Sequence, residues 1–454
     1  MTDARRPAPV RKPVALTIAG SDSGGGAGIQ ADLKTMEAGG AFGTSVVTAV
    51  TAQNTRGVDA THVLPESEIE AQLAAVTDDF DVRAAKTGML ATAPVVELVA
   101  KRAAGFDFPL VVDPVMVAAA GDRLLAEEAE AAYEDLIAEA TLVTPNVDEA
   151  EVLTGVRPTD EAGARLAGQR LLSMGADAAL VKGGHAPGEE VLDVLVTPDQ
   201  IETARHPRVD TDATHGSGCT LSAAIAARLA DGEPLADAVG RSVAFMERAI
   251  RYHHDVGRGP GAVHHMVGVR NEAARNETAE AVADVVEWFV DRDVSPLVPE
   301  VGMNVVGALP YAEATGETAA VEGRITRTLS GVKPNRGVRF GASSHVARFL
   351  LAAREFHPDL RFAVNARFDE TVEAALDALD GDVAEFVRED QPESVAAEEG
   401  STMQWGASRA FDRAEAPVAV VDRGAHGKEP IVKVVGETPQ RTAERVVTIL
   451  EALP

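Results

Sequence analysis

One pattern recurs through the first 185 residues and constrains the fold more than any other feature of the chain. Short apolar segments, many of them β-branched, end in small or polar residues, and most are followed by a stretch of helical periodicity. These segments are residues 14–20, 46–54, 84–90, 109–116, 140–146 and 178–185. Strands that alternate with helices predict a three-layer α/β domain with a mainly parallel sheet. Ligands of such sheets bind at the carboxyl ends of the strands, so functional residues are expected there.

The alternation stops between residues 257 and 278, where glycine, proline, histidine pairs and polar residues replace it. This change predicts a domain boundary. A helix over 279–293 opens the second half, in which strand-like and helical segments mix. We therefore expect a second α/β domain with a mixed sheet. The predicted organisation is a disordered tail over 1–13, a first domain over 14–266, a linker over 267–278 and a second domain over 279–454.

The charge of the chain limits its partners. Asp and Glu number 71 against 42 Lys and Arg, which gives a net charge of −29. Such a surface repels the phosphates of nucleic acids, so no nucleic-acid partner is expected. Only 8 of the 42 basic residues are lysines. An acidic chain with scarce lysine suits a salt-rich cytosol in which self-repulsion is screened, and this supports the hypothesis of a halophilic source.

No segment predicts contact with a membrane. The apolar runs all fall short of the roughly 18 residues that a membrane span requires. The first 13 residues, MTDARRPAPVRKP, are basic and proline-rich and lack the apolar stretch of a signal peptide. A cytoplasmic location and no membrane partner are therefore expected.

Cys219 is the only cysteine of the chain, which excludes an internal disulfide and a cysteine zinc cluster. It follows Gly216, Ser217 and Gly218 at the start of a helical stretch. Backbone N–H groups at such a helix N-terminus form an anion site, and the same field lowers the pKa of a cysteine. Cys219 is thus a candidate thiolate base toward a substrate hydroxyl. A small buried residue at a tight turn is the alternative that remains open.

Eight motifs of the first half resemble, in order, the hydroxymethylpyrimidine/phosphomethylpyrimidine kinase family of thiamine biosynthesis. They are TIAGSDSGGGAGIQADLKT (17–35), TAQNTRGV (51–58), AKTGML (85–90), VVDPVM (111–116), TPNVDEAEVLTG (144–155), VKGGH (181–185), THGSGCTLSAA (214–224) and GRGPGAVHH (257–265). The resemblance implies a ribokinase-like fold and ATP-dependent phosphorylation of hydroxymethylpyrimidine and its monophosphate. Ala213 departs from the family, which usually has Asn or Asp before THG, and its lack of a polar side chain could weaken ATP binding.

The resemblance also implies roles for residues of this sequence. Cys219 corresponds to the catalytic cysteine, and its neighbours Gly216, Ser217 and Gly218 to an anion hole. Residues that match the pyrimidine pocket are Gly20, Ala27, Gln53, Met89 and Val115. Residues that match the nucleotide and phosphate site are Lys182, Asn146 and Glu149. Asp113 and Glu149 are the candidate ligands of Mg²⁺, while Asp32 is expected to cap or brace a helix.

The second half carries another small-residue loop that enters a helix, FGASSHVARFLLAAREF (340–356). Ser343 or Ser344 is a plausible N-cap, the exposed amides suit a phosphate, and His345 would lie in the first turn. Arginines gather around the strand ends and indicate an anionic small ligand: Arg324, Arg327, Arg336, Arg339 and Arg367.

This half resembles the thiamine-phosphate synthase domain that archaea often fuse behind the pyrimidine kinase. The resemblance rests on PEVGMNVVGALPYA (299–312), AAVEGRITR (319–327), residues 339–368, TMQWG (402–406) and DRGAHGKEPIVKVVG (422–436). It implies a mixed-sheet α/β fold similar to class II aldolase-like domains. Arg324 and His345 match the family's essential pair. Arg324 would neutralise the leaving pyrophosphate, and His345 would hydrogen-bond a phosphate or donate a proton to it. Asp422 and Lys428 are weaker candidates for metal or phosphate contact.

The sequence therefore predicts a fused enzyme whose partners are small molecules: hydroxymethylpyrimidine, its monophosphate and thiazole phosphate. Kinases of this fold often pair, which favours a homodimer. Two alternatives stay open. The first domain could act on pyridoxal or pyridoxine, or the second could be a noncatalytic thiamine-phosphate sensor. Sensor domains tend to lack the Arg–His pair and to accompany a helix-turn-helix. This chain keeps the pair and shows no such motif, which favours a synthase.

Overall fold

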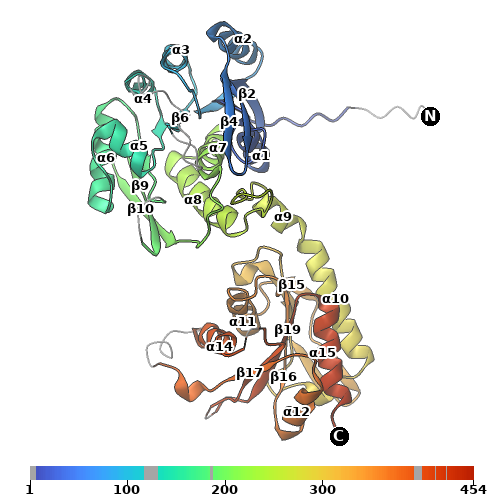
Figure 1. The fold of residues 1–454 in the computed structure, drawn as a ribbon. Helices are drawn as coiled ribbons and strands as arrows, with labels where there is room; N and C mark the ends of the chain where they lie inside the picture. Colours follow the sequence, from blue (N-terminus) through green and yellow to red (C-terminus); the bar gives the residue numbers. More distant parts are fainter. Residues whose placement is uncertain (1–6, 117–130, 185–187, 393–400, 415, 426) are drawn as a thin grey trace, which may run out of the picture. The chain divides into compact units, whose positions relative to one another are not determined.

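The computed structural model describes residues 7–116, 131–184, 188–392, 401–414, 416–425 and 427–454. The chain forms two compact units, which divide between Gly268 and Val269 (Figure 1). Residues 7–13 contain neither helix nor strand, and the rest of the predicted tail, residues 1–6, lies outside the described residues.

The first unit contains an eight-stranded sheet of order β10-β9-β8-β7-β6-β5-β1-β2. Its strands are β1 (Val14–Ala19), β2 (Phe42–Val47), β5 (Val82–Thr87), β6 (Leu110–Val112), β7 (Leu142–Val143), β8 (Ala179–Val181), β9 (Glu190–Val196) and β10 (Ile201–Pro207). The pairings from β8 to β2 are parallel, and β9 and β10 add at one edge in antiparallel orientation. The prediction of a mainly parallel sheet is thus confirmed.

The strand predicted over 46–54 is two strands. The first ends with β2 at Val47, and β3 (Ala49–Asn54) pairs with β4 (Gly57–Val63) in a separate two-stranded ribbon. Between them Thr48 is buried, with its N–H on the carbonyl of Ala19 and its hydroxyl on that of Met89. These two bonds anchor the end of the main sheet, and the chain then leaves it.

Helices cover both faces of this sheet (Figure 1). They are α1 (Gly28–Ala38), α2 (Glu66–Thr77), α3 (Ala93–Ala103), α4 (Tyr133–Ala138), α5 (Val147–Thr154), α6 (Glu161–Ser173), α7 (Ser217–Ala230) and α8 (Leu235–Arg251). Side chains of β1 alternate between the two faces, as a strand requires. Leu16 and Ile18 pack with α2, α3 and α4, whereas Thr17 hydrogen-bonds Asp32 of α1. Helix α7 packs against α1 and β5, so the central strands and these two helices frame the site described below.

The linker predicted over 267–278 is helical. Helix α9 (Val267–Ala273) and the first turn of α10 (Arg275–Asp291) occupy it. Val267, Asn271 and Thr278 are buried, and their spacing of four and seven residues is that of one helix face. Two of these three side chains are polar, which hid the periodicity. Asn271 binds Glu317, and Thr278 accepts a hydrogen bond from Arg361.

The second unit contains a seven-stranded sheet of order β15-β12-β11-β16-β19-β18-β17, in which only β17 and β18 pair in parallel. Its strands are β11 (Val305–Ala308), β12 (Thr318–Val321), β15 (Val338–Phe340), β16 (Phe362–Arg367), β17 (Val383–Phe386), β18 (Ala419–Asp422) and β19 (Ile431–Gly436). This confirms the predicted mixed sheet.

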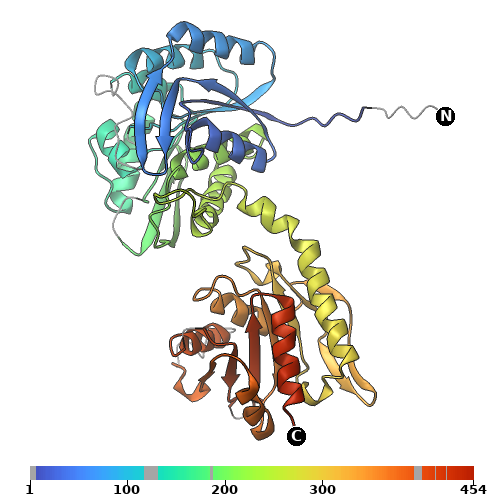
Figure 2. The same ribbon diagram turned by 45° about the vertical axis from the view of Figure 1, so that its right-hand side comes forward.

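Helices cover both faces of this second sheet (Figure 2), and an apolar core lies between each helical layer and the sheet. Helices α10, α12 (Glu370–Ala375) and α15 (Pro439–Glu451) pack on one face, and α11 (His345–Ala353) and α14 (Ser401–Phe411) pack on the other. Short 3-10 turns occupy Ser295–Leu297, Thr315–Glu317, Leu376–Ala378 and Arg388–Asp390. Among the described residues of both units, every helix is too short or too polar to span a membrane.

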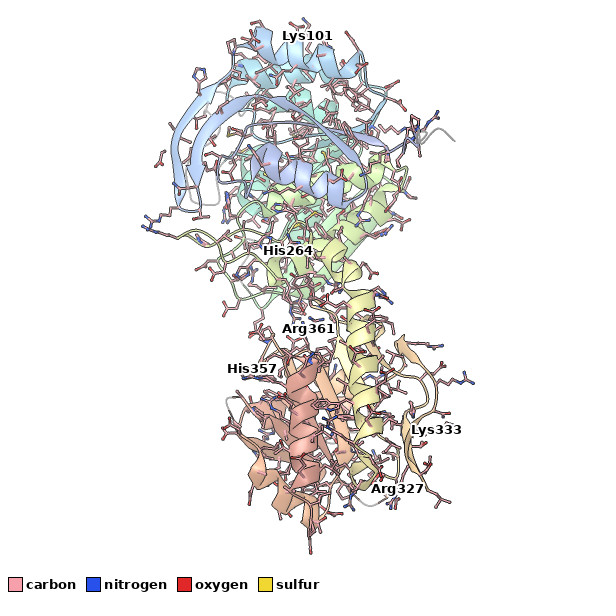
Figure 3. All side chains as sticks on the ribbon, turned by 90° about the vertical axis from the view of Figure 1, so that its right-hand side faces the viewer. Lys101, His264, Arg327, Lys333, His357 and Arg361 are labelled. Carbon is pink, nitrogen blue, oxygen red and sulfur yellow. The ribbon has the colours of Figure 1, made fainter. Side chains whose placement is uncertain are left out.

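The strand-like stretch over 319–329 forms two strands and not one. After β12 the chain turns at Gly323 and Arg324, both with positive φ, and continues as β13 (Ile325–Thr328). Strand β13 pairs with β14 (Gly331–Pro334) in a hairpin, and Figure 3 shows Arg327 and Lys333 on it. An arginine in the left-handed region is uncommon, and such backbone strain is concentrated at functional sites.

Candidate active sites

Helix α7 begins at a position that accepts only glycine. Gly216 has a φ of +79°, and a Cβ there would overlap the carbonyl oxygen of Gly26. The turn also corrects one prediction. Ser217 donates its N–H to the carbonyl of Thr214 at 3.1 Å, because the loop closes on itself there. Ser217 therefore does not offer its N–H to an anion. Gly218 lies in the first turn, where a helix supplies no acceptor for an N–H group.

Cys219 lies in this first turn and is partly exposed. Its thiol accepts a hydrogen bond from the backbone N–H of Gly28, the first residue of α1, so two helix N-termini point at it. The predicted low pKa is nevertheless wrong. Burial raises the pKa of Cys219 to about 11, the charge of Lys86 lowers it, and Asp32 and Asp113 raise it further. The helix N-terminus is visible in the sequence, whereas the burial and the two carboxylates appear only in the fold.

A buried ion pair lies beneath the thiol. Lys86 of β5 is fully buried, and its Nζ is 3.1 and 3.2 Å from the two carboxylate oxygens of Asp32. Thr17 donates a 2.6 Å hydrogen bond to the same carboxylate. Burial works against the charge of Lys86, but Asp32 offsets it and holds the pKa of the ammonium above its ordinary value. Asp32 thus braces α1 as predicted, and its partner is a lysine that sequence reasoning missed.

The ends of three strands bring the predicted phosphate and metal residues together. Lys182, after β8, forms a 2.9 Å ion pair with Asp113, after β6. A Cβ on Gly218 would lie 3.4 Å from both the Asp113 carboxylate and the Lys182 ammonium, so both groups flank the first turn of α7. Glu149 is buried, and burial raises its pKa to about 7, with Lys182 opposing and Asp113 reinforcing the shift. Asn146 caps α5 and forms a capping box with Glu149.

These carboxylates fit a magnesium ion that is shared with a nucleotide. Mg²⁺ prefers oxygen ligands and usually takes one or two carboxylates with phosphates and waters. Asp113 and Glu149 are close enough for the charge of one to raise the pKa of the other. No cluster of three or more His, Cys, Asp or Glu suited to a metal occurs in the described ranges. The two carboxylates therefore suit an ion whose other ligands come from the phosphates.

The structure brings most of the predicted pyrimidine pocket together. Gly20 donates its N–H to the carbonyl of Met89 at 3.1 Å, and a Cβ on Gly20 would overlap the terminal methyl of Met89. Ala27 precedes α1 and lies next to Gly216. Val115 is partly buried after β6, and its N–H is bonded to the carbonyl of Asp113. Val115 is thus positioned by its bond to Asp113, whereas Gly20 and Met89 are positioned by their bond to one another.

Two residues that sequence reasoning missed hold Gln53 and the glycine loop. Asp22 is buried, and its carboxylate accepts the N–H groups of Gly24, Gly26 and Ala27 at 2.7 to 3.0 Å. His215 Nε2 lies 3.2 Å from that carboxylate and 3.5 Å from the Gln53 amide nitrogen. Burial raises the pKa of Asp22, but these bonds outweigh it and hold the pKa below its ordinary value. An Asp at the head of a glycine loop was a usable signal for this role.

The second unit has a cavity of about 640 Å³ at the start of α11. Its lining includes Arg324 and His345, the predicted pair, together with Ser343, Ser344 and Lys428. The other predicted arginines do not gather there. Arg336 and Arg339 pair with Glu322, and Arg367 pairs with Asp369. Further cations on the lining are Arg388 and Lys433, neither of which was predicted.

Arg324 and His345 line this cavity from two different segments: Arg324 lies between β12 and β13, and His345 is the first residue of α11. Arg324 donates a hydrogen bond from its guanidinium to the carbonyl of Val301, and its backbone has a φ of +68°. His345 Nδ1 lies 3.2 Å from the hydroxyl of Ser344. Partial burial lowers the pKa of His345, and the cations Arg324, Arg348, Arg388 and Lys428 lower it further. The neutral imidazole is therefore surrounded by positive charge, and a bound anion would balance that charge.

The buried side of the cavity is a network of charges. Asp422 is fully buried, and Arg388 grips its carboxylate through two bonds of 2.8 and 2.7 Å. Lys433 Nζ lies 3.4 Å from the same carboxylate, and 5.1 and 5.4 Å from the ring centroids of Phe349 and Phe386. Burial lowers the pKa of Lys433, and Asp422 only partly restores it. Asp422 thus orients two cations, and its paired oxygens make it a poor ligand for a metal.

Comparisons with known proteins cover both units. Residues 22–264 match the family model of phosphomethylpyrimidine kinase, and residues 281–448 match that of thiamine-phosphate synthase ThiN. The hydroxymethylpyrimidine/phosphomethylpyrimidine kinase of Streptomyces coelicolor is 50% identical over 258 residues, which span 57% of this chain and 96% of the relative. The thiamine biosynthesis bifunctional protein ThiED of Geobacter sulfurreducens is 44% identical over 268 residues, 59% of this chain and 55% of its own. An ADP complex of Bacillus subtilis pyridoxal kinase aligns with a TM-score of 0.53 at 34% identity, over 57% of this chain and 99% of that one.

Proposed function

The chain belongs to the phosphomethylpyrimidine kinase family and joins its kinase domain to a thiamine-phosphate synthase domain, and on this premise we propose the chemistry of its two sites. The first site transfers the γ-phosphoryl group of ATP to 4-amino-5-hydroxymethyl-2-methylpyrimidine and then to the resulting monophosphate. The second site joins the diphosphate to thiazole phosphate and releases pyrophosphate. The proposal includes a cytoplasmic location and a homodimer.

In the first transfer, the hydroxymethyl oxygen bonds to the γ-phosphorus, the bond between that phosphorus and the β–γ bridging oxygen breaks, and ADP leaves. Cys219, once it has lost its own proton, takes the hydroxyl proton. Lys182 and the N–H of Gly218 stabilise the charge on the transferred group. Mg²⁺, if held by Asp113 and Glu149, supplies further neutralisation of the phosphates. In the second transfer a phosphate oxygen attacks, and the same groups position it.

Gly20, Met89 and Ala27 would enclose the pyrimidine ring, and Gln53 would read its polar edge. Gln53 offers both a donor and an acceptor, which suits an aminopyrimidine. The contacts of His215 and Asp22 with Gln53 and the glycine loop would hold the Gln53 amide in a fixed orientation toward the substrate. A rigid donor–acceptor pair rejects a ring that lacks the matching groups, because the protein groups would then be left unpaired.

In the synthase reaction, the ring nitrogen of the thiazole bonds to the methylene carbon of the pyrimidine diphosphate. The bond from that carbon to the diphosphate oxygen breaks, and pyrophosphate leaves with the electron pair. Arg324 and Lys428 would neutralise the leaving group, and His345 would hydrogen-bond it. The observation that carries this assignment is that Arg324 and His345, 21 positions apart in the sequence, line one cavity with three further cations.

Two alternatives compete with this proposal, and the first has support from solved structures. Solved pyridoxal kinases align with the first unit, with 31% identity for the enzyme of Staphylococcus aureus in complex with pyridoxal. Pyridoxal is therefore the competing substrate, and the ratio of kcat/KM for hydroxymethylpyrimidine and pyridoxal decides between them. The second alternative is that the C-terminal domain senses thiamine phosphate without making it.

One experiment tests the whole proposal. The purified full-length chain is incubated in high KCl with hydroxymethylpyrimidine, MgATP and thiazole phosphate, and thiamine phosphate is measured. Its formation supports both assignments. Accumulation of the pyrimidine diphosphate alone leaves the kinase in place and makes the second unit a sensor or a degenerate synthase. If neither product forms, and a parallel incubation with pyridoxal and MgATP yields phosphorylated pyridoxal, the kinase assignment is wrong.

A further inference from the structure

Lys86 is the least expected charge in the first unit. A lysine ammonium without exposure is rare unless it is paired, and this one lies on β5, an interior strand of the sheet. Its described contacts are with the two oxygens of Asp32. An ammonium has three N–H donors. The carboxylate of Asp32 takes at most two of these donors, so at least one is left for another acceptor. A Cβ on Gly88 would lie 3.0 Å from the Nζ, so this glycine also leaves room for the ammonium.

The geometry of α1 links this ammonium to the thiol. Gly28, whose N–H is bonded to Cys219, and Asp32, which holds Lys86, are four residues apart on α1. Residues four apart lie on the same helix face, about 6 Å from one another. Helix α7, which carries Cys219, packs against both α1 and β5. The thiol and the ammonium are therefore both held by α1, within a layer where α1, α7 and β5 pack together, and each charge acts on the other.

We propose that Lys86, fixed by Asp32, is the positioning charge that allows the Cys219 thiol to release its proton. The inference rests on the proposed function, in which Cys219 acts as the base of phosphoryl transfer. The charged groups that face the thiol are Lys86 from β5, Asp32 from α1 and Asp113 beyond β6, and Lys182 beyond β8 also interacts with it.

The signs of these charges explain why the lysine is needed. Burial and both carboxylates disfavour the thiolate. Among the groups that favour the thiolate, Lys86 has the largest effect. Asp32 has two effects, because it keeps Lys86 charged but also partly cancels its field at the sulfur. At an effective dielectric constant of about 20, two opposite charges that lie about 6 to 10 Å apart change a pKa by roughly one to two units. Removing Lys86 should therefore reduce the thiolate population by about 10- to 100-fold.

The single cysteine of the chain permits a direct test that does not depend on activity. The rate of Cys219 alkylation by iodoacetamide is measured from pH 7 to 10 on the full-length protein without nucleotide and with EDTA. We expect Lys86→Met to slow alkylation by about 10- to 100-fold at pH 8. Lys101→Met removes an exposed lysine of α3 (Figure 3) and should alkylate at the wild-type rate. Cys219→Ser gives the background.

A second variant guards against misfolding of Lys86→Met, which leaves Asp32 buried without its partner. The pair Lys86→Met/Asp32→Asn removes both charges. Because Lys86 acts on the thiol more strongly than Asp32 does, the double variant should alkylate more slowly than wild type and faster than Lys86→Met. An alkylation rate equal to or above wild type in the folded double variant would overturn the proposal.

Kinetics then separate this inference from the function on which it rests. In Lys86→Met, kcat for pyrimidine phosphorylation should fall in proportion to the thiolate fraction, while KM for the pyrimidine changes little. Slow alkylation together with full kinase activity of Cys219→Ala would keep the electrostatic role of Lys86 and remove Cys219 as the base. Wild-type alkylation of folded Lys86→Met would overturn the inference, whatever the kinase rate.

Discussion

The ammonium of Lys182 lies 2.9 Å from the carboxylate of Asp113, although 69 positions separate them in the chain. The two residues follow β8 and β6, strands that lie on either side of β7 in the sheet. Both flank Gly218, so a fixed cation, a carboxylate and a helix N-terminus meet at one point. Such an arrangement binds a phosphate on one side and an ion that neutralises it on the other.

Replacing Lys182 by Met should abolish most of the kinase activity. The variant lacks the fixed charge that stabilises the phosphoryl group in transfer, and loss of one such group typically lowers kcat by about 100- to 1000-fold. Steady-state assays with varied ATP and a thermal unfolding scan measure the effect. Lys101→Met serves as the control because that side chain is exposed on α3. Activity within twofold of wild type in the folded Lys182 variant would remove this residue from the site.

Replacing Gly216 by Ala should disrupt the first turn of α7. The backbone at Gly216 has a φ of +79°, and the new methyl would overlap the carbonyl oxygen of Gly26. We expect a loss of about 2 kcal/mol or more in stability, and lower kinase activity because the turn carries Gly218 and Cys219. Gly240→Ala is the matched control. Gly240 lies in α8 with open space around it, so alanine should stabilise the helix by about 0.5–1 kcal/mol. Similar melting temperatures for the two variants would contradict the proposed constraint.

Much of the kinase site was predictable because parallel strands end at one edge. Asp113, Asn146 and Lys182 each follow a strand of the predicted sheet, and the structure places Lys182 against Asp113 as that rule requires. Lys86 was not predictable in this way, since a single lysine inside a strand carries no local sign of burial. The pKa of Cys219 was predicted with the wrong sign for a related reason. The helix start is a local feature, whereas Asp32 and Asp113 approach the thiol only through the tertiary fold.

The second unit was less predictable in detail. Arg324 and His345 could be assigned only from the resemblance, since an arginine between two short strands has no local mark of function. Their partners Arg388 and Lys433 come from a short 3-10 turn and a buried strand, where charges are not expected. The helical segment over 267–278 was missed because the residues it buries include Asn271 and Thr278, whose polarity resembles that of a linker.

Replacing Arg324 by Ala should remove thiamine-phosphate synthesis and leave pyrimidine phosphorylation unchanged. The guanidinium lines the cavity and is held by Val301, so its loss removes charge where pyrophosphate departs. A decrease of about 100-fold or more in synthase kcat is expected. Arg327→Ala is the control, because Arg327 lies three residues further along and outside the lining of the cavity. Synthase activity that survives the Arg324 change would show that Arg324 does not stabilise the leaving pyrophosphate.

The stability of the chain should increase with salt. Its net charge of −29 produces self-repulsion that acts over about 30 Å at 0.01 M salt and about 3 Å at 1 M. The unfolding temperature is therefore expected to rise steadily as KCl is increased from 0.05 to 2 M. Sucrose of equal osmolality is the control. It carries no charge, so it separates the screening of charge by KCl from the general effect of solute exclusion from the protein surface. An unfolding temperature that is independent of KCl, with full activity in low salt, would argue against salt adaptation.

The pKa of His345 should rise when an anion enters the cavity. Partial burial and the cations Arg324, Arg348, Arg388 and Lys428 hold the pKa below its ordinary value in the free protein, so the imidazole is neutral at pH 7. Bound pyrophosphate offsets those cations and favours the imidazolium. The pKa of His345 would then be higher in the pyrophosphate complex than in the free protein. By linkage, pyrophosphate must bind more tightly as the pH falls from above the first of these pKa values toward the second. NMR titration of the imidazole with and without inorganic pyrophosphate measures the shift, and the His345→Gln variant assigns the resonance. A pKa that stays constant or falls would show that His345 does not contact the anion, and only Arg324 of the predicted pair would then remain as a pyrophosphate ligand.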